Sequence, residues 1–143
     1  MKTHFVFDEE RCVGCGACTV ACMDQNDISA GEKPLRAITR CDRGPEGPLW
    51  QFIHTGCLHC DPAPCIPVCP KGCIARDGDT GLVISDNANC IGCGSCANAC
   101  PHGAIHFVHS KITKCGGCLE RVREGLLPPC VKVCPHGALR FPR

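Results

Sequence analysis

Cysteine is the residue type in this chain whose number and spacing could support chemistry. The 143-residue sequence contains 18 Cys, about 13% of the chain and above the roughly 8–10% at which cysteine dominates a small fold. Sixteen of them form four quartets: Cys12, Cys15, Cys18 and Cys22; Cys57, Cys60, Cys65 and Cys69; Cys90, Cys93, Cys96 and Cys100; and Cys115, Cys118, Cys130 and Cys134. Thiolates in such arrays are typical metal ligands. Cys41 and Cys73 fall outside the quartets; Cys41 is expected to be a free thiol and Cys73 a buried thiol.

The spacing within the quartets indicates iron–sulfur clusters. The first and third quartets have the spacing C-x2-C-x2-C-x3-C, the ferredoxin motif for 4Fe–4S binding. Three thiolates meet on one cluster only if the loop curls tightly, and glycines such as Gly14 and Gly92 allow this. The fourth cysteine follows the third by four residues, so segments such as 18–22 are expected to be short helices. The second thiolate of such a helix binds the neighbouring cluster.

Prolines follow the last cysteine of three quartets, at Pro70, Pro101 and Pro135. They are expected to end these helices, because proline fixes φ and lacks an N–H group. Each Cys-Pro pair leads into a glycine turn and then an apolar run. Strands are therefore expected at 105–108 and 139–141, paired with the runs 82–84 and 5–7.

Residues 31–56 interrupt the repeat of quartets. The runs 35–39 and 49–53 flank a segment, 42–47, that is rich in turn-forming residues, which predicts a β-hairpin. The expected fold class is therefore α+β, with short helices and small antiparallel sheets.

Little apolar material is left once the cysteines are set aside. The sequence has five Phe, one Trp and no Tyr, with 16 Gly and 12 Pro. An ordinary hydrophobic core is out of reach, so the clusters must supply the interior, as metals do in many small domains. Trp50 is expected to pack beside a cluster rather than to relay electrons.

The formal net charge of +1 changes sign once the cofactors are counted. Sixteen bound thiolates and four oxidised clusters bring it to about −7. The Lys and Arg residues are therefore interpreted as counter-charge for the clusters, and no nucleic-acid partner is expected. Lys111, Lys114 and Arg121 flank the fourth quartet and either stabilise reduced clusters or are plain surface charges. His59, His102 and His136 lie beside quartet cysteines and are either solvated or hydrogen-bonded to cluster sulfides.

Disulfides and structural zinc are the alternative uses of these cysteines. Disulfides are typical of small secreted domains, but residues 1–10 have only a three-residue apolar run and are not expected to be a signal peptide. No segment approaches the ~20 apolar residues that span a bilayer, so a cytoplasmic location is expected unless a signal-bearing partner exports the chain. Zinc favours two separated C-x2-C pairs, which a third Cys at the same spacing does not fit.

The order of the quartets is similar to that of a known family. Together with the four-residue gap in the second quartet and the eleven-residue gap in the fourth, it resembles the iron–sulfur subunits of dimethyl sulfoxide reductase-type enzymes, over residues 5–142. Similar four-cluster subunits serve hydrogenases and tungsten aldehyde oxidoreductases. The resemblance implies two ferredoxin-like units: an outer unit of residues 1–56 plus 108–143, and an inserted unit of residues 57–107.

The resemblance also implies which cysteines bind each of four 4Fe–4S clusters. The implied sets are Cys12, Cys15, Cys18 and Cys134; Cys115, Cys118, Cys130 and Cys22; Cys57, Cys60, Cys65 and Cys100; and Cys90, Cys93, Cys96 and Cys69. The chain would then be a non-catalytic subunit that relays single electrons between a tungsten or molybdenum oxidoreductase subunit and another redox partner, which is a second subunit or a further copy of itself. A free-standing, diffusible polyferredoxin is the alternative function.

Overall fold

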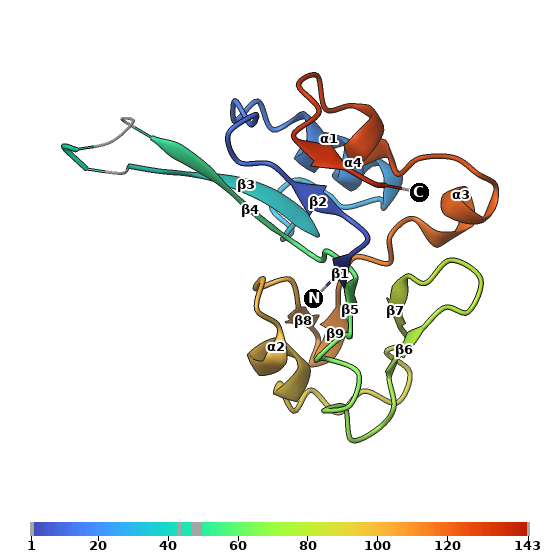
Figure 1. Ribbon diagram of the computed structural model, residues 1–143. Coiled ribbons are helices and arrows are strands. Elements are labelled where there is room, and N and C mark those ends of the chain that lie inside the picture. Colours follow the sequence, from blue (N-terminus) through green and yellow to red (C-terminus); the bar gives the residue numbers. More distant parts are fainter. Residues whose placement is uncertain (1, 43, 47–49, 143) are drawn as a thin grey trace.

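The computed structural model describes residues 2–42, 44–46 and 50–142. These residues form four short helices and ten short strands (Figure 1). The helices are α1 (Ala17–Gln25), α2 (Ser95–Ala99), α3 (Leu119–Arg123) and α4 (Pro129–Lys132). The strands are β1 (Lys2–Thr3), β2 (Val6–Phe7), β3 (Arg36–Cys41), β4 (Gln51–Gly56), β5 (Cys60–Asp61), β6 (Ile74–Arg76), β7 (Val83–Ser85), β8 (His106–Val108), β9 (Lys111–Thr113) and β10 (Leu139–Arg140).

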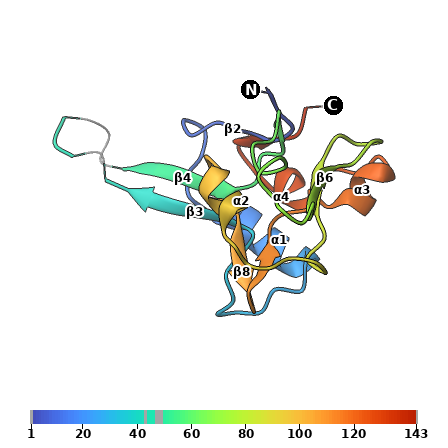
Figure 2. The same ribbon diagram turned by 90° about the horizontal axis from the view of Figure 1, so that it is seen from below.

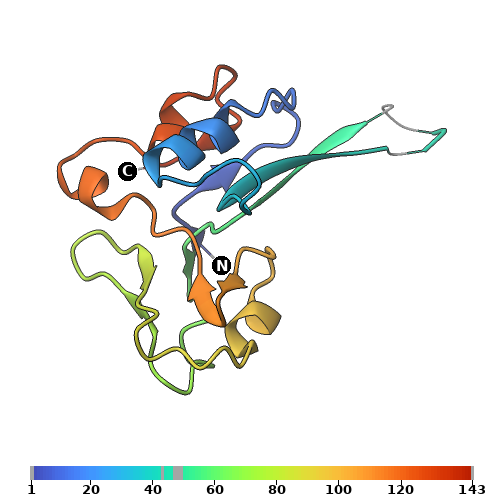
Figure 3. The same cartoon turned by 180° about the vertical axis from the view of Figure 1, so that it is seen from behind.

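The strands associate only as antiparallel pairs within the described residues: β1 with β5, β2 with β10, β3 with β4, β6 with β7, and β8 with β9. The N- and C-terminal segments pack together, because β2 pairs with β10 and α1 packs against α4 (Figure 3). The paired strands β3 and β4 project away from the rest of the molecule (Figure 2). Short helices and small antiparallel strand pairs were expected, and both are confirmed.

The helices begin and end largely where the cysteine pattern predicts. Helix α1 contains Cys18 and Cys22, and α2 contains Cys96 and ends just before Cys100. Cys100 has an extended backbone with φ −74° and ψ 118°, because the Pro101 ring disfavours helical geometry in the residue before it.

The second quartet does not contain the expected helix. Residues 64–68 form turns, in which Ile66 N–H donates to Ala63 O at 3.2 Å and Cys69 N–H donates to Ile66 O at 3.4 Å. Pro64 and Pro67 are the physical reason, because neither has an N–H group for the helical hydrogen-bond pattern. The sequence contained this signal, and the prediction overlooked it.

The predicted hairpin in 31–56 is confirmed as β3 and β4, although Arg43, Gly47 and Leu49 of the predicted turn and strand lie outside the described residues. The pairing of 5–7 with 139–141 is also confirmed, as β2 and β10.

The prediction that 82–84 pairs with 105–108 is wrong. Strand β7 pairs with β6, and β8 pairs with β9. The link between β6 and β7 is short, and the Asp77 carboxylate closes it by accepting hydrogen bonds from Thr80 N–H at 2.9 Å and Thr80 O–H at 2.7 Å. A local hairpin closes a shorter loop than a distant pairing would, and therefore loses less chain entropy.

Cysteines make up much of the interior of the described chain. Nine of its nineteen buried hydrophobic residues are Cys, and eight of these nine belong to the quartets. One apolar cluster lies around Ile74, Val83 and Ile112, and a second around Phe5 and Leu82. Cysteine thiols line both apolar clusters, so the packing of the interior depends on the cofactors that these thiols bind. Among the described residues, no helix combines the length and apolar character that a bilayer crossing requires.

Candidate metal centres

All eighteen cysteines lie in the described part of the chain, and each has a free thiol. Shared hollows and mutual electrostatic effects divide the sixteen quartet thiols into four groups, each with thiols from two quartets. We number these groups one to four from the end that contains Cys15 to the end that contains Cys93.

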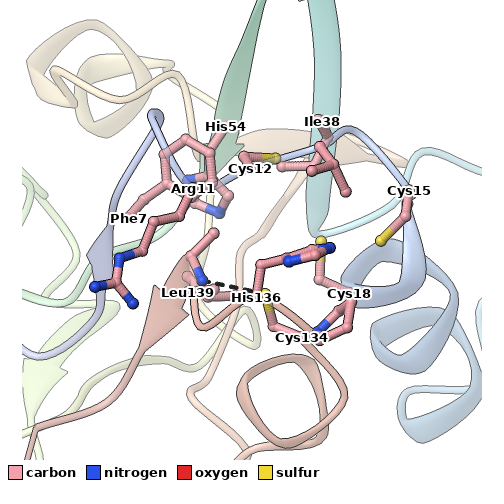
Figure 4. A pocket seen from close by; sticks show the side chains of 14 residues that line it. Phe7, Arg11, Cys12, Cys15, Cys18, Ile38, His54, Cys134, His136 and Leu139 are labelled. Atoms are coloured by element: carbon pink, nitrogen blue, oxygen red, sulfur yellow. Dashed lines mark hydrogen bonds between the residues drawn. The ribbon is translucent and has the colours of Figure 1, made fainter.

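Group one consists of Cys12, Cys15, Cys18 and Cys134. They line one hollow (Figure 4). The first three come from the glycine loop and helix α1, and Cys134 comes from the segment just after α4. The loop turns through residues with positive φ at Gly14 (72°) and Gly16 (74°), a geometry that glycine adopts without strain.

Group two consists of Cys22, Cys115, Cys118 and Cys130, and it is the most buried. Burial, together with the nearby thiolates of Cys115 and Cys118, raises the pKa of Cys22 to about 11. Burial also raises the pKa of Cys130 to about 12, with Arg36 opposing the shift. Without a cation these thiols would stay protonated, so metal binding here must release protons.

Group three consists of Cys57, Cys60, Cys65 and Cys100. Burial and then the charge of Cys100 raise the pKa of Cys60. Burial also raises the pKa of Cys65, and the charge of Cys100 adds to that rise. Group four consists of Cys69, Cys90, Cys93 and Cys96, which line a second hollow. Cys73 lines this hollow as well and is buried, as expected for a thiol outside the quartets.

Backbone N–H groups point at several of these sulfurs. Cys73 N–H donates to Cys69 Sγ at 3.2 Å, and Ala138 N–H donates to Cys134 Sγ at 3.3 Å. Both contacts arise from the same Cys-Pro-x-Gly repeat, which turns the chain back over its own cysteine. The N–H of Cys73 lowers the pKa of Cys69, since a hydrogen bond to the charged form stabilises it.

Three features of the groups fit the binding of 4Fe–4S clusters. Each group offers four thiols, which are the ligands that such clusters take in proteins. Two of the groups surround open hollows, and the backbone donates hydrogen bonds to sulfur in groups that include Cys57, Cys90 and Cys115 at 3.3–3.4 Å. Hydrogen bonds to sulfur are one of the means by which proteins tune cluster potential.

Arg36 and His54 lie beside the thiol groups, which the sequence analysis did not predict. Arg36 lies on β3 and is fully buried. Its Nη1 donates to His54 Nε2 at 2.6 Å, and burial and the nearby Arg36 charge lower the pKa of His54 to about 3. His54 also lines the hollow of group one. Neither residue belongs to a cysteine motif, and both lie in the hairpin that interrupts the repeat, so no local signal marked them.

The histidines and basic residues named from the sequence have different environments. His59 is fully buried and its Nδ1 accepts a hydrogen bond from Val83 N–H at 2.9 Å, so the solvated interpretation is wrong for it. His136 is exposed and His102 is half-buried.

Of the basic residues, Lys114 is buried, while Lys111 and Arg121 bind backbone carbonyls. Trp50 borders a hollow with Cys12, but it is half exposed, with the Arg40 guanidinium 5.1 Å from its ring centroid.

Gly92 and Gly94 offer a matched test of the loop in group four. Both have positive φ, 70° and 81°, so alanine costs each about 1 kcal/mol of backbone strain. Only at position 92 would a Cβ collide, at 2.6 Å from the carbonyl oxygen of Ser110. We expect Gly92→Ala to lose about four irons per chain, the content of one cluster, and Gly94→Ala to retain them. Iron analysis of anaerobically purified protein measures this, and equal iron loss in both variants would contradict it.

Comparison with known proteins identifies the class. The family model described as a 4Fe-4S dicluster domain matches residues 48–143, and a model described as a 4Fe-4S binding domain matches residues 3–24. The chain belongs to the 4Fe–4S dicluster family, as its quartets predict.

Relatives in this family are named as reductase subunits. The chain is 40% identical over 142 residues to the thiosulfate reductase electron transfer subunit PhsB of Salmonella typhi, covering 95% of this chain and 73% of that protein. It is 40% identical over 107 residues to the arsenate respiratory reductase iron-sulfur subunit ArrB of Shewanella sp. (strain ANA-3), covering 75% and 45%. It is 38% identical over 137 residues to the B subunit of the anaerobic dimethyl sulfoxide reductase of Escherichia coli (strain K12), covering 88% and 66%.

The chain thus spans between 45% and 73% of the length of these three relatives. The family, the four 4Fe–4S clusters and the non-catalytic, electron-transfer nature of the chain agree with the predictions made from the sequence.

Proposed function

We propose that the chain relays single electrons between a catalytic reductase subunit and another redox partner. What carries the proposal is the set of junctions that links the four thiol groups into a row. When bound, each 4Fe–4S cluster takes up and releases one electron. The chain itself places the four sites next to one another and exposes the two ends of the row to partner proteins.

Each junction in the row is supported by a specific contact. Groups one and two meet across α1, which contains Cys18 and Cys22 one helical turn apart. Groups two and three meet where Cys57 and Cys115 lie in one buried apolar cluster; burial raises the pKa of Cys57, and the charge of Cys115 adds to the rise. Groups three and four meet across α2, which leads from Cys96 to Cys100.

These groups are the ligand sets that we propose for the four clusters, each with its fourth thiol from a different quartet. They also support two ferredoxin-like units, one from both ends of the chain and one inserted between them. We move the predicted boundary from residue 107 to the end of β9, because β8 and β9 form a single hairpin that a boundary at 107 would divide.

The two ends of the row are the proposed docking points. Cys15 of group one and Cys93 of group four are the exposed quartet thiols. Each has an exposed apolar neighbour, Val13 at 53% and Ile91 at 58%, which suits contact with a partner protein. By likeness to the thiosulfate, arsenate and dimethyl sulfoxide reductase subunits, we propose a molybdenum or tungsten reductase at one end. A cytoplasmic location stays a prediction.

Anaerobic co-purification tests this function. A tagged chain isolated from its native host should bring down a larger subunit together with molybdenum or tungsten in stoichiometric amount. The chain itself should contain about sixteen irons and accept about four electrons in a reductive titration. A chain that contains all its iron but purifies without any partner would instead be a diffusible polyferredoxin.

A further inference from the structure

Two basic side chains are buried in the described chain, Arg36 at 0% and Lys114 at 7% exposure. Neither forms an ion pair with an Asp or Glu among the described residues. A buried cation without an opposite charge is strongly destabilising. Something else in the interior must therefore balance these two charges.

Arg36 faces group two. Its Nη2 lies 3.6 Å from Cys115 Sγ and 3.3 Å from the carbonyl oxygen of Cys57, and its guanidinium covers the Phe5 ring at 4.6 Å. Although burial lowers the pKa of Arg36, the thiolates of Cys115 and Cys130 more than offset this and raise it. Once a cluster is bound and these thiols are deprotonated, their thiolates are the anions that Arg36 meets.

Lys114 is hydrogen-bonded to Cys115, which lies in one buried cluster with Cys57 of group three. Its Nζ donates to the carbonyl oxygens of Val83 and Cys115, the latter at 2.7 Å, so the ammonium is held in place by neutral acceptors. Its charge acts on the thiols of Cys57 and Cys65, where it opposes the effect of burial. The two cations therefore lie at the centre of the row, where groups two and three adjoin, and not at its exposed ends.

We infer that Arg36 and Lys114 are internal counter-ions that stabilise the reduced state of the two central clusters, Arg36 at group two and Lys114 at group three. The inference rests on the ligand sets proposed above. A cluster becomes more negative on reduction, so a nearby fixed cation raises its midpoint potential. The effect is strong because the low-dielectric interior screens charges weakly. Neither residue is a cluster ligand; each acts through its charge on the midpoint potential of the cluster beside it.

Potentiometric titration followed by EPR tests this in the iron-loaded chain. We expect Arg36→Gln to lower the midpoint of one cluster so that its ratio of reduced to oxidised form at a fixed potential falls about tenfold, which is 59 mV for one electron. Lys114→Gln should lower the midpoint of a different cluster. Arg36→Lys keeps the charge and should restore most of the wild-type value.

Arg40→Gln is the matched control, because it removes the same charge from the same strand at an exposed position. Its shift should be small and should vanish in high salt, whereas the Arg36→Gln shift should persist. The affected clusters are assigned by comparison with Cys118→Ser for group two and Cys65→Ser for group three.

Unchanged midpoints in Arg36→Gln and Lys114→Gln, with all four clusters retained, would overturn the inference. So would an equal loss of iron from Arg36→Gln and Arg36→Lys, because then shape and not charge is required. Iron loss from Arg36→Gln alone supports it, since the anionic site then lacks its counter-ion. If the wild-type chain itself contains fewer than four clusters, it is the ligand assignment that is wrong, and the charge effect can still be read on the clusters present.

Discussion

Removal of iron and sulfide under anaerobic conditions is expected to unfold the whole chain. The helices have nine, five, five and four residues, too short to persist in water without packing. The strands form only isolated pairs, which are marginal without a hydrophobic face to cover. Loss of the clusters also leaves Arg36 and Lys114 buried without counter-ions. Small-angle scattering should show the radius of gyration rise from about 15 Å to about 39 Å.

The zinc interpretation gives the control for this experiment. Addition of zinc to the cluster-free chain should not restore the compact radius, whereas reconstitution with iron and sulfide should. A cluster-free chain that keeps a radius near the folded value, with its strand signal in circular dichroism, would show that side-chain packing suffices. That result would contradict the claim that the cysteine-bound clusters are required for the fold.

Pairs of cysteine substitutions are expected to separate the proposed crossed ligand sets from a simple one-quartet-per-cluster arrangement. Cys18 and Cys134 line the same hollow although they come from different quartets. Cys18 and Cys22 come from the same quartet, but Cys22 lies with Cys115 and Cys118. We therefore expect Cys18→Ala with Cys134→Ala to alter one cluster, and Cys18→Ala with Cys22→Ala to alter two.

The number of clusters with changed EPR signals is the measurement, supported by iron content. If each quartet binds its own cluster, the two results will be reversed. Cys41→Ala with Cys73→Ala is the control and should leave all four clusters intact, because neither thiol belongs to a quartet. This control also tests whether the Cys73 thiol is a cluster ligand, since Cys73 lines the hollow of group four and its N–H donates to Cys69 Sγ.

Local features of the fold were open to prediction because they depend on neighbours in sequence. Helix α1, the hairpin of β3 and β4, and the helix ends before proline all follow from spacing and turn residues within a few positions. The turn at 64–68 was equally local, and Pro64 and Pro67 indicated it. The pairing of β7 with β6 was missed because repeat similarity suggested a distant partner, while the short Asp77 link made the near pairing less costly in chain entropy.

The cofactor and the class of protein were determined by the sequence alone. Ligand type and spacing are covalent properties of the chain, and four cysteine quartets with tight glycine loops suit few other metals. The side chains around the ligands were beyond the sequence. Nothing near Arg36 in the sequence distinguishes it from Arg40 on the same strand, yet one is fully buried beside Cys115 and the other is exposed.

Only the tertiary structure decided which charges face the thiols, because Arg36 and Cys115 are 79 residues apart and meet through the packing of a hairpin against the ends of the chain. Burial, and with it the local dielectric, is a property of the assembled interior. The sequence therefore determined which cofactor the chain binds, and the fold decided which buried charges surround that cofactor.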